Sequence, residues 1–366
     1  MSVRYIALVV LCLLVSCVRE DDTGYVEYSL KLESSLPLDD FIEDVKYIEL
    51  ELTPESFLSD VDRFAVDSNY YYLQSREEIF VFDKFGKYIS KVDRKGRSAI
   101  EYNSITDYDV HNGRIYVLSN SQRKILVYNI DGGCENTIDL DDWYHNISVN
   151  EAGILLYSER ANSQKYDVLK LDFDGKVVAE YIPSGAKSGI MYGVSPFMKQ
   201  SDNSYFLSFP YDRRLWKLSG DKCSVQCGFS VEGGINMSEE DIDSMTYEEL
   251  KKLLISDTYL KRINGFIAEE YAIFALIDVN IKNKGLRSLL VKVNMRTGEL
   301  DTYLCGEEIN QSYPFFSNLL KLEADRLYSV VNASYIHSVT NSMNGTNNEL
   351  IDLNQNPTLC VYTLRM

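Results

Sequence analysis

The chain of 366 residues has a formal net charge of −18 and a pI near 4.7. Because an acidic surface repels phosphate backbones, nucleic acid is excluded as an expected partner. The length would suit two or three average domains, but a repeat that runs through most of the chain favours one large closed domain, and the 12% of aromatic residues suits an all-β protein.

The first 17 residues have the features of an export signal. Ile6 to Val15 form an apolar run that is too short to cross a bilayer and follows the positive charge of Arg4. Leu14 to Cys17 resemble a bacterial lipobox, in which the cysteine is lipidated and becomes the mature N-terminus. Residues 1–17 are therefore predicted to be a lipoprotein signal peptide with Cys17 as the lipidation site. The alternative is an ordinary signal peptide with an incidental cysteine.

An acidic segment follows directly. Glu20-Asp21-Asp22 resembles the tag that sends lipoproteins of Bacteroidota to the outer cell surface, the alternative being a solvated linker. The expected location is the outer membrane or cell surface, with the protein held by its lipid anchor. Residues 18–42 are interpreted as a tether and residues 43–366 as the folded domain. Strict alternation over Val45–Leu52, stopped by Thr53-Pro54, predicts a strand without a hairpin partner of its own.

A strand, a turn and a returning strand then recur along the chain. Ile79 to Phe82 are β-branched and aromatic residues that suit a buried strand, and Asp83 and Gly86 suit a type I turn. The corresponding turns end at Gly132, Gly175, Gly220 and Gly298, with spacings of 46, 43, 45 and 78 residues from Gly86 onward. The last spacing is one period plus an insertion.

A period of about 40–50 residues with several strands per unit is typical of a propeller blade. The six repeats predict an all-β, six-bladed β-propeller of four-stranded antiparallel blades, and the alternative is a β-sandwich with coincidental spacing. The last repeat is short of a strand. We therefore expect Val45–Leu52 to pair with the C-terminal blade and close the ring.

An insertion at about 236–258, between the fourth and fifth blades, is predicted to be helical. Ser238 to Asp241 and Thr246 to Glu249 look like capping boxes, and Leu250, Leu253 and Leu254 are spaced as on one face of a helix. Helices are expected at about 238–244 and 246–256. They would form either a lid or partner-docking element, or a decoration packed on the rim. In the sixth repeat, the polar stretch Tyr335–Gln355 is predicted to be a long loop.

The connection between the first two repeats resembles a known family. Arg94, Gly96, Glu101 and Tyr102 match the Arg-x-Gly-x-Gly-Pro-Gly-Glu-Tyr loop of the six-bladed propeller lipoproteins of Bacteroidota, which are related in shape to NHL-repeat propellers. Ser98-Ala99-Ile100 departs from that pattern. Tyr47 to Glu51 and Asn356 to Leu359 also resemble family landmarks, so the resemblance covers nearly the whole mature chain. It implies the fold and the envelope location, and little chemistry.

Basic residues are the candidate ligand contacts. Arg94, Arg97, Arg213 and Arg214 stand out in an acidic chain and would hold an anionic group, such as a uronate or a phosphate, at the channel mouth. Surface solvation is the alternative. Tyrosine rings could also stack on sugars, although most must lie in the core.

Other motifs indicate neither catalysis nor a metal. The three histidines belong to different repeats, and the chain has no HExxH, nucleophile elbow or phosphate-binding glycine loop, so no catalytic residue and no metal ligand is predicted. Asn129 to Gly132 and Asp172 to Gly175 look like half of a calcium loop and are interpreted as hairpin turns. The five cysteines outside the leader are expected to be unpaired small hydrophobes, since Cys223 and Cys227 would lie too far apart to bridge.

The expected function is a monomeric cell-envelope lipoprotein that serves as a non-enzymatic binding or scaffold module for a glycan, peptide or protein partner. The alternative is a metal-dependent hydrolase or lyase of the lactonase kind, with a cluster of acids that holds a divalent cation in the central channel. A third hypothesis is a purely structural envelope protein. No cofactor is predicted apart from that cation.

Overall fold

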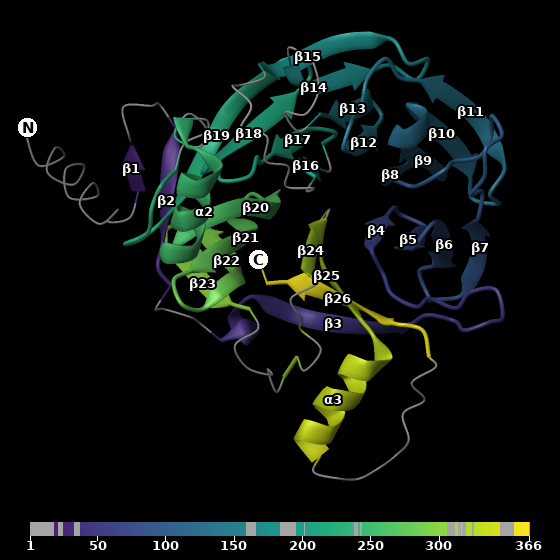
Figure 1. The fold of residues 1–366 in the computed structure, drawn as a ribbon. Helices are drawn as coiled ribbons and strands as arrows, with labels where there is room; N and C mark the ends of the chain where they lie inside the picture. The colour runs from purple at the N-terminus through teal and green to yellow at the C-terminus, as the bar shows by residue number, and fades with distance from the viewer. Residues whose placement is uncertain are drawn as a thin grey trace, which may run out of the picture.

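Six small antiparallel sheets are arranged as a ring around a central axis (Figure 1). The structure is a computed structural model that describes residues 18–20, 25–32, 37–158, 166–183, 195–200, 202–237, 241, 244–305, 312, 313, 316, 320–323, 326–344 and 355–365. The predicted signal peptide, with Cys17, lies outside these residues, as does most of the helix predicted at 238–244. The predicted six-bladed β-propeller is confirmed.

The first three blades each consist of four consecutive strands. Blade 1 contains β4 (Arg63–Val66), β5 (Tyr70–Ser75), β6 (Glu78–Asp83) and β7 (Tyr88–Val92). Blade 2 contains β8 (Asp107–His111), β9 (Arg114–Ser119), β10 (Lys124–Asn129) and β11 (Cys134–Asp139). Blade 3 contains β12 (Asn146–Asn150), β13 (Gly153–Tyr157), β14 (Tyr166–Leu171) and β15 (Val177–Pro183).

The other three blades follow the same plan, with additions at blades 4 and 6. Blade 4 contains β16 (Phe197–Lys199), β17 (Tyr205–Leu207), β18 (Arg214–Ser219) and β19 (Lys222–Val231). Blade 5 contains β20 (Tyr259–Ala268), β21 (Ala272–Ile281), β22 (Gly285–Asn294) and β23 (Leu300–Leu304). Blade 6 contains β24 (Leu320–Glu323), β25 (Arg326–Val331), β26 (Thr358–Leu364) and, from the other end of the chain, β3 (Ile42–Glu49). Figure 1 shows the first strand of each blade nearest the axis.

The ring is closed as predicted, by an N-terminal strand paired with the C-terminal one. β3 runs antiparallel to β26, with Ile48 opposite Leu359, and it begins three residues before the predicted start at Val45. The buried Asn356 amide fastens this junction. It donates to the carbonyl oxygens of Glu51 (2.9 Å) and Ser56 (2.8 Å) and accepts from the amide of Leu58 (2.8 Å).

Part of the predicted tether belongs to the propeller instead. β2 (Val26–Leu30) adds to the outer edge of blade 4, parallel to β19, and the short β1 (Val18–Glu20) pairs with β2 (Figure 1). Tyr28 and Leu30 are buried, and the Tyr28 ring lies 5.4 Å from that of Phe229. Because this strand covers an exposed edge of blade 4, residues 26–30 stabilise the domain rather than link it to an anchor.

The repeated hairpin turns owe their shape to one side chain each. Oδ1 of Asp83 accepts hydrogen bonds from the amides of Phe85 (2.8 Å) and Lys87 (2.9 Å). Asn129 and Asp172 make the same pair of bonds two and four residues ahead in the next two blades. The polar oxygens of the two stretches that look like calcium loops therefore hold their own backbone, which confirms the hairpin interpretation.

Neighbouring blades pack through buried apolar and aromatic side chains. Tyr72 and Val81 of blade 1 share a core with Tyr108 and Val117 of blade 2. Between blades 4 and 5, the rings of Phe206 and Phe266 lie 4.5 Å apart in an edge-on arrangement. The short 3-10 helices η1 (Leu38–Asp40) and η2 (Asn120–Gln122) lie in connections. Each blade therefore buries one face against the blade before it and the other face against the blade after it, as a closed ring requires.

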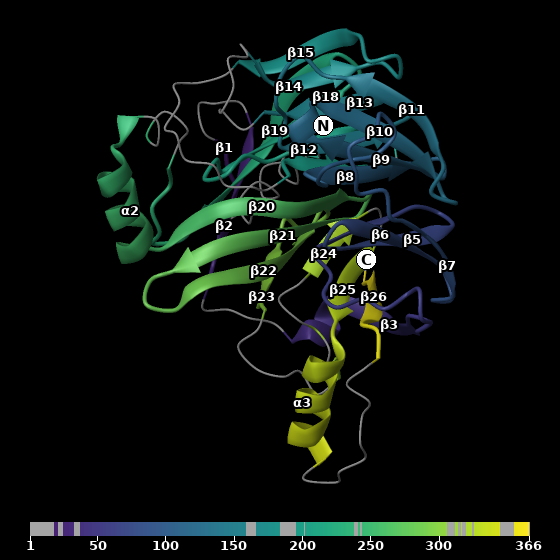
Figure 2. The same ribbon diagram turned by 45° about the vertical axis from the view of Figure 1, so that its right-hand side comes forward.

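In the part of the chain that the structure describes, the helices α2 (Tyr247–Ser256) and α3 (Ala333–Asn344) lie outside the ring of sheets (Figure 2). α2 begins with the predicted capping box of Thr246 and Glu249, and its Leu250 is buried against Tyr211 and Tyr259. The predicted apolar stripe thus packs the insertion onto the rim of blades 4 and 5. α3 extends away from blade 6 and occupies the first half of the segment predicted to be a loop. That prediction was wrong for residues 335–344.

The cysteines behave as predicted. Cys134, Cys223, Cys227, Cys305 and Cys360 are all free. Burial raises the pKa of Cys227 and of Cys360 to about 12 and that of Cys223 to about 11. Since the thiolate is the reactive form, these three side chains act as small hydrophobes.

Candidate ligand site in the central cavity

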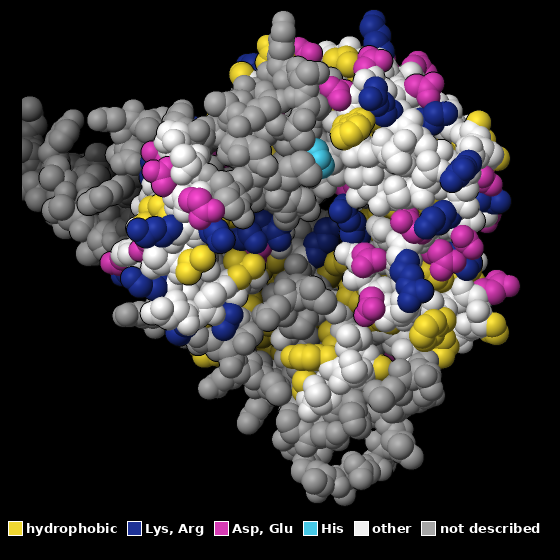
Figure 3. Space-filling view, in the orientation of Figure 1, with side chains coloured by type: hydrophobic (Ala, Val, Ile, Leu, Met, Phe, Trp, Pro, Cys, Tyr) yellow, Lys and Arg dark blue, Asp and Glu magenta, His cyan; other side chains and the backbone are white. Residues whose placement is uncertain are grey.

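The inner strands enclose a cavity of about 490 Å³ at the centre of the ring. It is lined from every blade, by Arg63 and Phe64 (blade 1), Asp107 and Asp109 (blade 2), Ile147 and Ser148 (blade 3), Phe197 and Lys199 (blade 4), Arg262 and Asn264 (blade 5) and Lys321 and Leu322 (blade 6), among others. In Figure 3, Lys and Arg side chains flank the hollow in the middle of the face shown. A volume of this size is typical of small-molecule sites.

Two aspartates of β8 hold blade 3 in place. One residue separates Asp107 from Asp109 on the innermost strand of blade 2. The carboxylate oxygens of both accept hydrogen bonds from the edge of β12. Asp107 accepts from the amide of Ile147 (3.1 Å), and Asp109 accepts from the amide of Val149 (2.6 Å) and the hydroxyl of Ser148 (2.9 Å). Unpaired amides on an inner edge strand would otherwise lose hydrogen bonds in a buried position. These carboxylates therefore have a structural role at the cavity wall.

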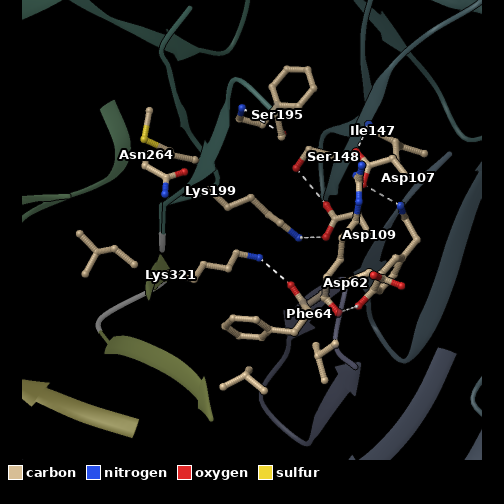
Figure 4. Close-up of a pocket in the computed structure, with 18 of the residues that line it drawn as sticks. Asp62, Phe64, Asp107, Asp109, Ile147, Ser148, Ser195, Lys199, Asn264 and Lys321 are labelled. Atoms are coloured by element: carbon tan, nitrogen blue, oxygen red, sulfur yellow. Dashed lines mark hydrogen bonds and ion pairs between the residues drawn. The ribbon is translucent and has the colours of Figure 1, made fainter. Parts of the chain in front are cut away.

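The same two carboxylates also bind cationic side chains, in the ion pairs Arg63–Asp107 and Lys199–Asp109. A third base of the lining, Arg262, pairs with Asp278, which lies outside the lining. The Lys199–Asp109 distance is 2.8 Å and the Arg262–Asp278 distance is 2.7 Å. Figure 4 shows Lys199 and Lys321 extending into the cavity, toward Asp109 and the carbonyl oxygen of Phe64, to which Lys321 donates at 2.8 Å.

In each pair the acid is the more buried partner, and the base, which lines the cavity, is the more exposed one. The exposed side-chain fractions are 8% for Asp107 against 37% for Arg63, 9% for Asp109 against 23% for Lys199, and 6% for Asp278 against 22% for Arg262. A molecule that enters the cavity would therefore meet guanidinium and ammonium groups more readily than the carboxylates paired with them. Four bases (Arg63, Lys199, Arg262 and Lys321) and three acids (Asp62, Asp107 and Asp109) line the cavity, and of these acids Asp62 is the exposed one.

Burial also affects the ionisation of Asp107, which lines the cavity. It raises the pKa of the Asp107 carboxyl, while the Arg63 guanidinium and the hydrogen bonds from Asn146 and Ile147 act in the opposite direction. The Asn146 amide donates to Asp107 at 3.0 Å. Four donors from three blades thus converge on one carboxyl group, which favours its ionised form as a partner for Arg63.

The predicted arginines lie elsewhere. Arg94 and Arg97 belong to the connection between blades 1 and 2, and Arg94 donates to the carbonyl oxygen of Gly132 (3.0 Å), which ties this loop to the turn of blade 2. The buried Tyr102 donates to the carbonyl oxygen of Glu77 (2.6 Å), and the Glu101 carboxylate accepts from the amide of Ser98 (2.9 Å). The loop that resembles the family pattern is therefore pinned by its own side chains.

Arg213 and Arg214 are held by acids of their own. Arg213 pairs with Glu27 of β2 (3.2 Å), so it fastens the N-terminal strand to blade 4. Arg214 pairs with Asp212 (2.8 Å) and stacks on the ring of Trp216. The structure does not bring the four predicted arginines together, and none of them lines the cavity. A ligand role for them stays a prediction.

The described residues do not form a cluster of acids suited to a metal. Within the part of the chain that the structure describes, no three His, Cys, Asp or Glu side chains gather as a metal site. His111 instead stacks on Phe173, with ring centroids 6.4 Å apart, and burial lowers its pKa.

Among the residues that the structure describes, no helix is long and apolar enough to cross a membrane.

The residues of the cavity were missed because they are scattered along the sequence. Arg63, Lys199, Arg262 and Lys321 each come from a different inner strand. One local signal was present, because the stretch Asp107-Tyr108-Asp109 alternates acid and aromatic residues within a strand. A pair of acids at alternate positions of a buried inner strand indicates polar partners on the neighbouring blade.

Comparisons with known proteins give the family of this chain and solved structures that share its fold. The family described as Domain of unknown function (DUF4934) matches residues 26–363. Among curated proteins, none matches the chain. Similar solved structures include a "Putative exported protein" from Bacteroides fragilis, which is 16% identical with a TM-score of 0.71 over 93% of this chain and 100% of that one. A member of the DUF4221 family from Bacteroides vulgatus is 10% identical, with a TM-score of 0.52 over 88% of this chain and 97% of that one. At these identities the likeness establishes the fold alone.

Proposed function

The chain belongs to the family DUF4934, a domain of unknown function, and we propose that it is a non-enzymatic binding protein of the cell envelope that holds its ligand in the central cavity. The observation that carries this proposal is the cavity itself, which is open and lined by polar and aromatic side chains from all six blades. A ring of blades fixes such a site rigidly, and a rigid site loses little entropy when a ligand binds.

Binding without catalysis is favoured by the state of the polar groups. The carboxylates of Asp107 and Asp109 are buried and engaged by backbone amides and cations. A general acid or base must instead reach the proton that it transfers. The third acid of the lining, Asp62, accepts a hydrogen bond from the backbone amide of Arg76. The cations, the Asn264 amide and the aromatic and aliphatic side chains that also line the cavity can recognise a ligand by charge, hydrogen bonds and contact.

A screen of stabilising ligands tests the site. Mono- and disaccharides, sugar acids and short peptides would be added to the purified protein, and the midpoint of thermal unfolding would be measured. Ligands that bind only the folded state should raise this midpoint. Ser195 is exposed and lines the cavity, so Ser195→Trp should fill it and abolish the stabilisation.

The matched control is Ser98→Trp, which places the same ring on the exposed loop between blades 1 and 2. It should leave the stabilisation by each ligand unchanged. Ligands that stabilise the Ser195→Trp variant as much as the wild type would bind outside the cavity and contradict the proposal.

The proposed location is the outer membrane or cell surface, with a lipid on Cys17. The apolar leader and its lipobox support it, as does the fold shared with the "Putative exported protein" of Bacteroides fragilis. Cys17→Ser should move the protein from the membrane fraction to the soluble fraction of the cell envelope, because one cysteine carries the whole anchor. Unchanged fractionation of this variant would contradict lipid anchoring and leave the cavity proposal intact.

A further inference from the structure

We propose that the ligand of the central cavity is a small molecule that carries a carboxylate or phosphate group, which binds against Arg63, Lys199 and Arg262. This inference rests on the proposed function, since it names the chemical class that the same cavity takes. It follows from the three ion pairs, in which each base lines the cavity and is more exposed than the acid that it binds, so that the bases keep donors available to a ligand.

These three cations have N–H donors to spare. Arg262 uses Nε to bind Asp278, and Arg63 uses Nη1 to bind Asp107. A guanidinium has five N–H groups, and within the described chain neither arginine makes a further hydrogen bond with its side chain. Lys199 donates to Asp109 and to the carbonyl oxygen of Val110 (3.2 Å), which leaves one of its three protons. Donors next to a cavity are satisfied best by an anion.

The geometry of the guanidinium N–H groups further limits the chemical class of the ligand. A guanidinium presents its N–H groups in a planar fork that matches two oxygens of one carboxylate or phosphate. The buried acids fix the position of each base, so its free edge is oriented before a ligand arrives. The rings of Phe64 and Phe197 also line the cavity and offer flat apolar faces to the rest of the ligand.

Size and charge exclude larger anions. A cavity of about 490 Å³ is suited to a molecule of one or two rings. A polyanion such as a nucleic acid would in addition be repelled by the net charge of −18. A single acidic group that reaches the local cations is favoured, and its binding should weaken as salt is raised.

Calorimetric titration of the purified protein tests the inference with two matched pairs of probes. D-galacturonate is compared with D-galactose, and glucose 6-phosphate with glucose. At least one acid should bind about tenfold or more tightly than its neutral partner, since a hydrogen bond to a charged group is worth at least one factor of ten. The preferred acid distinguishes a carboxylate ligand from a phosphate ligand.

A double variant at the cavity and a control variant elsewhere on the surface test whether the charge in the cavity is responsible for binding. Arg262→Gln combined with Asp278→Asn removes the base and its buried partner together, which avoids leaving a lone buried carboxylate. It should weaken binding of the acid about tenfold or more while the unfolding midpoint stays near that of the wild type. Arg114→Gln combined with Glu135→Gln removes an exposed ion pair that does not line the cavity, and this control should leave the affinity unchanged.

Three results would overturn the inference: equal affinity for acid and neutral sugar, equal weakening by the Arg114→Gln and Glu135→Gln control, or no saturable binding of either acid. Equal affinity combined with loss of binding in Ser195→Trp would leave the cavity as the site and refute only its preference for anions. If ligands found in the screen also bind Ser195→Trp normally, the proposed function itself fails.

Discussion

Asp107→Ala should destabilise the protein by about 3 kcal/mol, because it leaves the Ile147 amide and the Asn146 side chain without acceptors in a buried position. Each unsatisfied buried donor costs about 1–3 kcal/mol. Loss of the ion pair with Arg63 contributes less to this destabilisation, because the Arg63 side chain is 37% exposed and water screens its charge. The free energy of unfolding from urea denaturation measures the effect.

Asp62→Ala is the matched control for this prediction. Asp62 lines the same cavity and is exposed, and its carboxylate accepts a hydrogen bond from the backbone amide of Arg76 (2.8 Å). Its removal should cost no more than about 1 kcal/mol. Equal losses for the two variants would show that Asp107 does not link blades 1, 2 and 3.

Gly86→Ala should cost about 2–5 kcal/mol, more than the same change at another turn of the repeat, because a backbone penalty and a steric clash add together. Gly86 has φ of +85°, and a Cβ there would lie 2.1 Å from the carbonyl oxygen of Glu49 and 2.9 Å from Cγ2 of Ile48. Both atoms belong to the closing strand β3. The left-handed backbone costs an alanine about 1–2 kcal/mol, and displacing a packed strand adds about 1–3 kcal/mol.

Gly298→Ala separates these two terms. Gly298 occupies the corresponding turn of blade 5, with φ of +73°, and a Cβ added there would meet no other atom within 4 Å. This variant should lose only the backbone term, about 1–2 kcal/mol. If the two alanine variants unfold at the same urea concentration, β3 does not press on the turn of blade 1, and the closure is looser than the structure indicates.

The repeat could be predicted from sequence because each turn carries its own chemistry. Asp83 and Gly86 determine a local hairpin whatever surrounds it, and five further repeats follow the same strand pattern. The closing strand was predictable for a different reason, since a strand without a hairpin partner at one end matched a missing strand at the other. Its start differed by three residues because pairing with β26 sets the register.

Two elements were missed although their patterns were present. Val26, Tyr28 and Leu30 alternate with polar residues, as a half-buried strand does, but only the folded ring shows that they add to blade 4. In α3, Ile336 and Val339 are spaced as on one face of a helix. The Asn- and Ser-rich composition of that segment favoured a loop instead.

The cavity could not be predicted, because blade geometry rather than sequence proximity brings its residues together. Arg63 and Lys321 lie at opposite ends of the chain, and closure of the ring makes their blades neighbours. The predicted arginines show that basic residues close together in the sequence need not form a ligand site. Arg213 and Arg214 are adjacent, and each is paired with a different acid. Charge in a sequence indicates a ligand only when its partners are known.

Lysine acetylation with and without D-galacturonate tests most directly whether the central cavity is the ligand site. Mass spectrometry would follow the rate of modification at Lys199 and Lys321 in the cavity, and at Lys87 and Lys95 on exposed turns and loops. Bound D-galacturonate should slow modification of Lys199 and Lys321 and leave Lys87 and Lys95 unchanged. Protection of Lys95 without protection of Lys199 and Lys321 would place the ligand on the loop of Arg94 and contradict the cavity as the binding site.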